Sequence, residues 1–163
     1  MLVLKVLLNL MHIATSSDKL DLFSEQKTKE LAIKFSEKLK PGNVVFLFGE
    51  IGVGKTTFIR YLINWLQKKN NLELTEVTSP TFNILNEYYI NQTQVNHYDL
   101  FRLKSYEDLK NLNLFDENSN IITLIEWPQI IKKKPKNLIE LNFNYEDDHQ
   151  KRSVIIKGLN LKF

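Results

Sequence analysis

The sequence has no cysteine, which excludes disulfide bonds, thiolate metal sites and cysteine nucleophiles. Arginine occurs only as Arg60, Arg102 and Arg152, and the net charge is a mild +3. A protein that binds nucleic acid by itself usually carries a denser basic stripe. The one tight basic run, residues 132–134, stands just before Pro135 and is interpreted as a solvated loop, with direct binding of RNA left open.

Long apolar stretches are lacking as well. The most apolar segment, residues 1–11, is broken by Lys5 and Asn9 and is too short to span a bilayer. It has no charged leader and no small-residue cleavage site, so we expect neither a signal peptide nor a membrane anchor. These absences agree with a cytoplasmic location. We hypothesise that Met11 is the true start, which would make residues 1–10 an extension and residues 11–163 a single domain.

Hydrophobic patterning alternates between helical and extended periods. Ser24 fits an N-cap, and Leu31, Phe35 and Leu39 recur at helical spacing in a helix that we expect to run up to Pro41. The apolar runs at 44–48 and 121–125 are typical of strands buried on both faces. Besides these two strands, the pattern predicts a helix at 55–69, a hairpin of 82–90 with 94–100, a short helix starting near Ser105, and a terminal hairpin of 139–145 with 154–156.

A phosphate-binding motif lies between the first buried strand and the next helix. Residues 49–56 match G-x-x-x-x-G-K-[ST] at every fixed position. Its glycines let backbone N–H groups converge on a phosphate, and the positive end of the helix dipole points at the same anion. Lys55 would reach the β- and γ-phosphates, and the Thr56 hydroxyl would bind Mg²⁺. The predicted nucleotide-binding residues are Gly49, Glu50, Ile51, Gly52, Val53, Gly54, Lys55, Thr56 and Thr57.

The motif also sets the expected fold. A buried strand, a phosphate loop and a helix, followed by further strands, are the first unit of a P-loop NTPase. We therefore predict an α/β fold, a three-layer sandwich with a mostly parallel central sheet and added β-hairpins.

Hydrolysis of a bound nucleotide additionally needs carboxylates. Glu126 follows the buried strand 121–125, and Asp99 follows the stretch 95–98. An acidic residue at the end of such a strand commonly completes a magnesium site or orients the attacking water. We favour Glu126 for both the metal site and catalysis. Asp99 stays balanced between a catalytic and a merely solvated carboxylate.

Several neighbours of these carboxylates have two interpretations each. His97 alone is more often structural than functional. Arg102 could neutralise a transferring phosphoryl group or pair with Asp99. Trp127 is interpreted as packing. Residues 78–81 resemble a switch loop whose hydroxyls sense γ-phosphate or Mg²⁺, and an ordinary polar turn fits them equally well.

Taken together, the motifs resemble one family, TsaE (also called YjeE), the small ATPases of bacterial tRNA threonylcarbamoyladenosine synthesis. The resemblance covers about residues 24–128 and, more loosely, the terminal hairpin. The P-loop alone is shared by a vast superfamily, whereas the later blocks are far more specific. The matching segments are Pro41-Gly42, Gly49–Thr57, Thr78-Ser79-Pro80-Thr81-Phe82, Asn86-Glu87-Tyr88, His97-Tyr98-Asp99-Leu100-Phe101-Arg102-Leu103 and Glu126-Trp127-Pro128.

This resemblance implies a role for each matching residue and a set of partners. TsaD, working with TsaB, would transfer the threonylcarbamoyl group to adenosine 37 of tRNA. This chain would hydrolyse ATP to drive that complex without performing the transfer, and tRNA would be acted on through the complex. The implied roles are phosphate and Mg²⁺ binding by Lys55 and Thr56, completion of the metal site by Glu126, positioning or activation of water by Asp99, a first switch at Thr78, Ser79 and Thr81, and a second switch around Asp99 with His97 and Arg102.

Departures from the family pattern are few. Phe101 stands where the family often has tyrosine, and Ile51 and Val53 replace smaller residues at positions where we expect the side chains to point outward.

Two rival functions are a small-molecule kinase and a nucleotide-gated binding module without useful turnover. The kinase is disfavoured because the chain lacks an arginine-rich lid. The binding module would be supported if hydrolysis stayed absent in the presence of the partners.

Overall fold

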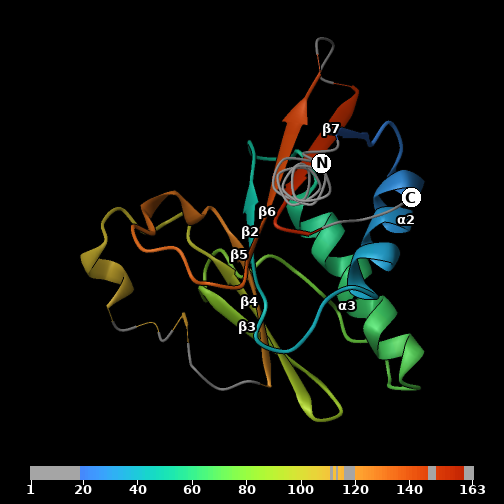
Figure 1. Ribbon diagram of the computed structural model, residues 1–163, viewed down its shortest axis with the longest axis horizontal. Helices are drawn as coiled ribbons and strands as arrows, with labels where there is room; N and C mark the ends of the chain where they lie inside the picture. The colour runs from blue at the N-terminus through green and yellow to red at the C-terminus, as the bar shows by residue number, and fades with distance from the viewer. Residues whose placement is uncertain (1–18, 111, 113, 116–119, 147–149, 160–163) are drawn as a thin grey trace, which may run out of the picture.

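The structure is a computed structural model that describes residues 19–110, 112, 114–115, 120–146 and 150–159. A single sheet is seen nearly edge-on in Figure 1, and the two α-helices of the described residues lie on one side of it. The expected extension at residues 1–10 lies outside the described residues, so the predicted domain boundaries remain a prediction. The elements are β1 (Lys19–Asp21), α2 (Glu25–Ser36), β2 (Val44–Phe48), α3 (Lys55–Lys69), β3 (Leu85–Ile90), β4 (Thr93–Asp99), η1 (Glu107–Leu109), β5 (Ile121–Glu126), η2 (Pro128–Ile130), β6 (Leu138–Tyr145) and β7 (Arg152–Lys157).

The strands follow the order β1-β7-β6-β2-β5-β4-β3 across the sheet. The four central strands, β6, β2, β5 and β4, are parallel to one another. At one edge β3 pairs antiparallel with β4, and at the other β7 and β1 are added antiparallel. The near-continuous burial of β2 and β5 matches their apolar sequences, as a parallel sheet covered on both faces requires. The predicted α/β fold with a mostly parallel centre and added hairpins is confirmed.

Each face of the sheet buries its own apolar cluster. On the helical side, Phe35 of α2 and Phe58 of α3 meet edge to face, 5.4 Å apart between ring centroids, over β2, β5 and β6. Burying a side chain of this size contributes roughly 1.5–3 kcal/mol. On the opposite side, Phe46 and Ile125 pack against Leu109 of η1, so the third layer consists of 3₁₀ turns and loops in the described residues.

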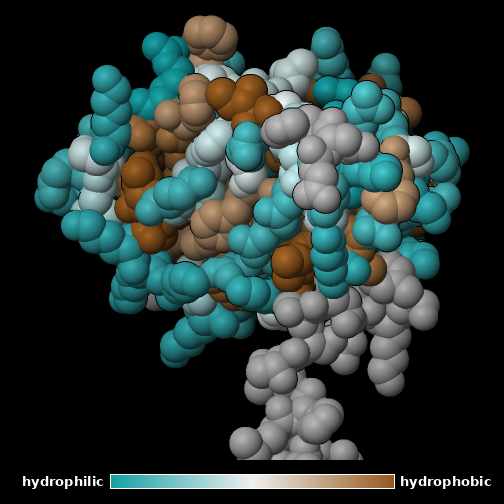
Figure 2. Space-filling model, turned by 90° about the horizontal axis from the view of Figure 1, so that it is seen from above, coloured by the Kyte–Doolittle hydropathy of each residue, from teal (hydrophilic) through white to brown (hydrophobic). Residues whose placement is uncertain are grey.

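The face of the molecule seen in Figure 2 is mostly hydrophilic. In the view of Figure 2, hydrophobic residues form several separate patches between polar and charged side chains. No helix in the described part of the chain is long and apolar enough to cross a membrane.

The structure corrects two predicted boundaries. Helix α2 ends at Ser36 instead of continuing to Pro41, because the Lys38 N–H bonds to the Phe35 carbonyl three residues back and tightens the chain into a turn. Strand β3 starts at Leu85, not at residue 82. The residues before it form a turn in which the Ile84 N–H bonds to the Pro80 carbonyl at 2.6 Å and Ile84 has a φ of 68°.

Two short elements of the structure were not predicted from the sequence. Strand β1 has three residues, too few for a recognisable alternation, and it exists because it pairs with β7, with Leu20 opposite Val154. The turn η2 begins directly after Trp127, whose φ of 58° puts the backbone in the left-handed region. These additions do not alter the order of the predicted strands and helices.

The parallel centre brings three strand ends together. Strand β2 leads into the phosphate loop, and Leu47 near its end lies opposite Glu126 at the end of β5. Glu126 in turn lies opposite Asp99 at the end of β4. Because parallel strands share one carboxyl edge, the two acidic residues are placed beside the loop by the register of the sheet.

Candidate nucleotide-binding site

The loop from Gly49 to Gly54 has the backbone that an anion-binding loop requires. Gly49, Gly52 and Gly54 have φ values of 138°, 77° and 113°, in the region that favours glycine. A Cβ on Gly49 would also lie 2.7 Å from the Phe143 carbonyl oxygen, so no larger residue fits there. Gly54 is the N-cap residue of α3 and provides no side-chain cap, which leaves the first N–H groups of the helix available to an anion.

Lys55, the first residue of α3, is held against the loop itself. Its Nζ donates hydrogen bonds to the carbonyl oxygens of Gly49 at 2.8 Å and Glu50 at 2.9 Å, and it lies 4.0 Å from the centroid of the Trp127 ring. Burial lowers the pKa of the Lys55 ammonium, and the negative charges of Glu126 and Asp99 act in the opposite direction. The result is a nearly buried cation facing two carboxylates, which is the charge pattern that phosphate and Mg²⁺ would complete.

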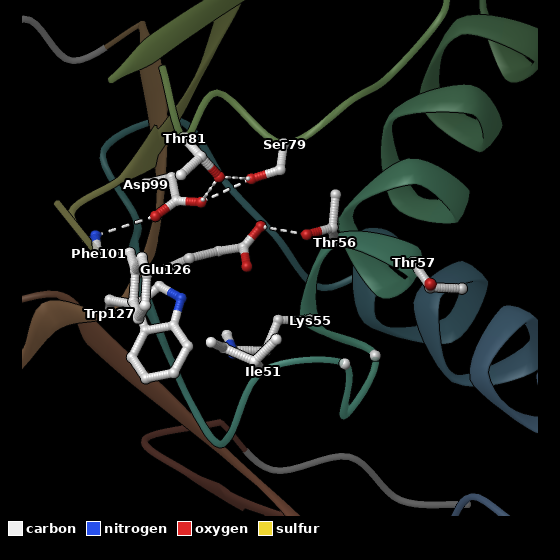
Figure 3. A pocket seen from close by; sticks show the side chains of 12 residues that line it. Ile51, Lys55, Thr56, Thr57, Ser79, Thr81, Asp99, Phe101, Glu126 and Trp127 are labelled. Atoms are coloured by element: carbon white, nitrogen blue, oxygen red, sulfur yellow. Dashed lines mark hydrogen bonds between the residues drawn. The ribbon is translucent and has the colours of Figure 1, made fainter. Parts of the chain in front are cut away.

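Glu126 connects the helix to the sheet. Its Oε1 accepts a hydrogen bond from the Thr56 hydroxyl at 2.8 Å (Figure 3). The same oxygen lies 3.0 Å from Nε2 of His97, which is completely buried. Glu126 itself is only 3% exposed, so its carboxylate is fixed by two neighbours inside the protein.

Asp99 is held by a different segment of the chain. Its Oδ2 accepts hydrogen bonds from the hydroxyls of Ser79 at 2.6 Å and Thr81 at 2.7 Å, and its Oδ1 accepts the Phe101 N–H at 3.0 Å (Figure 3). Two hydroxyls of the predicted switch loop therefore close onto the second carboxylate. Thr78, the third, is exposed, and its side chain is not among the residues that line the cavity.

A cavity of about 380 Å³ opens between the loop and these carboxylates. Among the predicted nucleotide-binding residues, Gly49, Glu50 and Val53 are not part of its lining. Val53 corrects the expectation of an outward side chain, because it is 1% exposed and packs in the core, whereas Ile51 is 68% exposed as expected. The cavity is lined by Ile51, Gly52, Gly54, Lys55, Thr56, Thr57, Ser79, Thr81, Asp99, Phe101, Glu126 and Trp127.

Arg102 lies outside this cavity. Its guanidinium carbon is 5.2 Å from the centroid of the Phe82 ring, which is itself 84% exposed. Of the two roles considered from sequence, pairing with Asp99 is therefore not what the structure shows.

Two aromatic residues have a larger part in the site than their sequence context predicts. Trp127 does pack against the second core cluster, but it also forms a wall of the cavity beside Lys55. Its ring stacks at a tilt on Phe101, with centroids 4.8 Å apart. Their place in the sequence is the feature that could have indicated this role, because Phe101 follows Asp99 by two residues and Trp127 follows Glu126 by one.

The donor set suits magnesium. A threonine hydroxyl and carboxylate oxygens are the hard ligands that Mg²⁺ prefers, and Mg²⁺ is usually bound by one or two carboxylates together with substrate phosphates and water. In the described residues there is no group of three or more histidine, cysteine or acidic side chains arranged to hold a metal. The hydroxyl of Thr56 and the carboxylate of Glu126 therefore fit a magnesium ion that would be bound together with phosphates.

The phosphate loop, the parallel strands and the acidic strand ends define the class of P-loop nucleotide-binding proteins. The model of the family described as "Threonylcarbamoyl adenosine biosynthesis protein TsaE" matches residues 22–154. The chain belongs to the TsaE family.

Individual relatives agree with this assignment. The protein named tRNA threonylcarbamoyladenosine biosynthesis protein TsaE from Rickettsia bellii is 44% identical over 78% of this chain and 87% of its own length. The protein of the same name from Nostoc sp. is 34% identical over 84% of both chains. A crystal structure of YdiB from Bacillus subtilis has a TM-score of 0.65, covering 90% of each chain at 21% identity, which supports the fold.

Proposed function

We propose that this protein binds and hydrolyses ATP with Mg²⁺ as a component of the machinery that makes N6-threonylcarbamoyladenosine at position 37 of tRNA. The names of its relatives support the pathway. The observation that carries the ATPase is the Thr56–Glu126 hydrogen bond of 2.8 Å, because it joins the phosphate loop to an acidic strand end in one cavity. A loop that only bound phosphate would not need this carboxylate.

Each side chain has a distinct task in this proposal. Lys55 and the free N–H groups of α3 bind and orient the phosphates. Thr56 and Glu126 would hold Mg²⁺, and the bound ion would supply positive charge next to the phosphates. Asp99 positions or activates the attacking water, and Ser79 and Thr81 report on the state of the nucleotide through their hydrogen bonds to Asp99.

TsaB and TsaD are the proposed partners. In this arrangement TsaD transfers the threonylcarbamoyl group, and hydrolysis by this chain drives the cycle of the complex in the cytoplasm. tRNA is acted on through the complex. Slow turnover by the isolated chain is expected, since switch-like P-loop proteins often need a partner to complete the site.

Binding is tested by titration calorimetry of the folded protein with Mg·ATP and Mg·ADP. Heat of association is expected for both, and its absence would overturn the nucleotide site. Turnover is tested by measuring phosphate release with and without TsaB and TsaD, together with modification of tRNA. Binding without turnover, even with both partners, would leave a nucleotide-gated binding module. Turnover that required an added metabolite and phosphorylated it would indicate a kinase.

A further inference from the structure

His97 is buried at a cost that the sheet alone does not explain. It lies on β4, opposite Leu124 of β5, and none of its surface is exposed. One ring nitrogen, Nδ1, is buried without a hydrogen-bond partner among the described residues. Burying a polar atom unpaired costs stability, so a leucine of similar volume would suit a purely structural position better.

The other ring nitrogen has a specific partner. Nε2 lies 3.0 Å from Oε1 of Glu126, the oxygen that also accepts the Thr56 hydroxyl. An ionised carboxylate can only accept hydrogen bonds, so Nε2 must be the atom that carries the ring proton. Nδ1 has no partner among the described residues, so the contact with Glu126 is the one hydrogen bond of the ring there.

Both hydrogen bonds converge on one oxygen of the carboxylate. The other oxygen of Glu126 is turned toward the cavity, on the side of Lys55 and Ile51 (Figure 3). Thr56 approaches from α3 and His97 from the interior of the sheet, so the two donors restrain rotation of the carboxylate. His97 has no place in the cavity lining and does not touch the nucleotide space itself.

We propose that His97 is a positioning residue that fixes the Glu126 carboxylate through an Nε2–H donor, with Oε2 presented to a divalent cation. The inference deepens the proposed function and rests on it for the identity of the site. A histidine that donates to a ligating carboxylate is an outer partner of the metal site, and the loss of such a partner typically lowers metal affinity by about 10- to 100-fold.

Two substitutions of nearly equal polarity separate this role from simple packing. In His97→Gln the amide nitrogen can reach the position of Nε2, whereas in His97→Asn it reaches only that of Nδ1. We expect His97→Gln to keep most of the cation affinity and His97→Asn to lose about 10- to 100-fold. If His97 only filled space, the folded His97→Gln and His97→Asn proteins should bind Mn²⁺ equally well, because packing does not depend on which nitrogen position is occupied.

The probe is Mn²⁺, measured by electron paramagnetic resonance in the presence of ADP, so the result does not depend on turnover. ADP affinity without metal should stay unchanged in both variants, and thermal unfolding verifies that each is folded. A folded His97→Asn protein that binds Mn²⁺ like the wild type would overturn the inference. If the wild type binds Mn²⁺ and the variants differ as expected, but no ATP is hydrolysed with the partners, the proposed function fails and the positioning role stands.

A second measurement covers the case in which neither variant folds. Long-range ¹⁵N–¹H correlation spectra of the wild type report which nitrogen of each of the three histidines carries the proton. For the buried His97 ring we expect a protonated Nε2. An unprotonated Nε2 could not donate to the carboxylate and would overturn the inference.

Discussion

The two carboxylates of the site are held in contrasting ways. Glu126 is fixed by Thr56, in the first turn of a long helix, and lies against the buried ring of His97. Asp99 is fixed mainly by Ser79 and Thr81, which lie in a segment without helix or strand between α3 and β3. Both residues end neighbouring strands and are equally buried at 3% exposure, so burial does not distinguish them.

What differs is the rigidity of the groups that hold each carboxylate. A helix and a sheet core change little during a reaction, whereas a loop is the usual element that orders and releases in a switch. We infer that Glu126 is the constant half of the site, whose geometry precedes nucleotide binding. Asp99 is the half that can respond to the nucleotide, because its hydroxyl partners can leave it without disturbing the sheet.

Lys55→Ala should have the largest effect, because this ammonium is the only buried cation that faces both carboxylates in the described part of the site. Truncating one partner of a buried, hydrogen-bonded charge pair costs about 2–5 kcal/mol, so affinity for ATP should fall by about 30- to 4,000-fold. Calorimetric titration measures this loss. Unchanged affinity in a folded variant would show that the phosphates do not contact the loop.

Glu126→Gln should come next and should act on turnover. The amide keeps the shape of the side chain and removes its charge, so ATP still binds to the loop while the metal site is weakened. We expect kcat to fall by about 10²- to 10³-fold with little change in affinity for ATP alone. Phosphate release in the presence of the partners is the measurement. A loss of nucleotide affinity as large as that of Lys55→Ala would contradict the separate roles of the two residues.

The fold was largely predictable because its signals are local. Strand β2 and helix α3 were predicted with their observed bounds, since a buried apolar run and a glycine-rich loop leave few alternatives. The end of α2 was not, because lysines beyond Ser36 are good helix formers and only turn hydrogen bonds stop the helix there. Strand β1 depends entirely on its partner β7, which no local pattern reveals.

The site was predictable in its residues more than in its contacts. The motif located Lys55 and Thr56, and strand ends pointed to Asp99 and Glu126. The pairing of each carboxylate depends on register across the sheet and on the path of a loop, which spacing does not encode. For the same reason Trp127 was interpreted only as packing, although its left-handed backbone turns it to the cavity wall.

Asp99→Asn sharpens the comparison between the two carboxylates, because it changes only the one that is held by the loop. The amide removes the charge that would activate water, and general-base groups contribute about 10²-fold or more. We expect slower turnover by about that factor, with binding of both ATP and Mn²⁺ close to wild type because Glu126 keeps its partners. Turnover and Mn²⁺ affinity are measured on the same preparation. Wild-type turnover would remove Asp99 from the mechanism.

Thr81→Val should have the smallest effect, because Ser79 still donates to the same oxygen of Asp99. Removing one donor to a charged acceptor costs about 1.5–3 kcal/mol when nothing compensates, so with Ser79 in place turnover should fall by no more than about 10-fold. Thr81→Ser keeps the hydroxyl and serves as the matched control. If the loop responds to nucleotide, hydrogen exchange in residues 78–82 should differ between Mg·ADP and a non-hydrolysable Mg·ATP analogue in the wild type, and this difference should shrink in Thr81→Val. Identical exchange in both wild-type complexes would mean that Asp99 is held as rigidly as Glu126, and the distinction between the two carboxylates would fail.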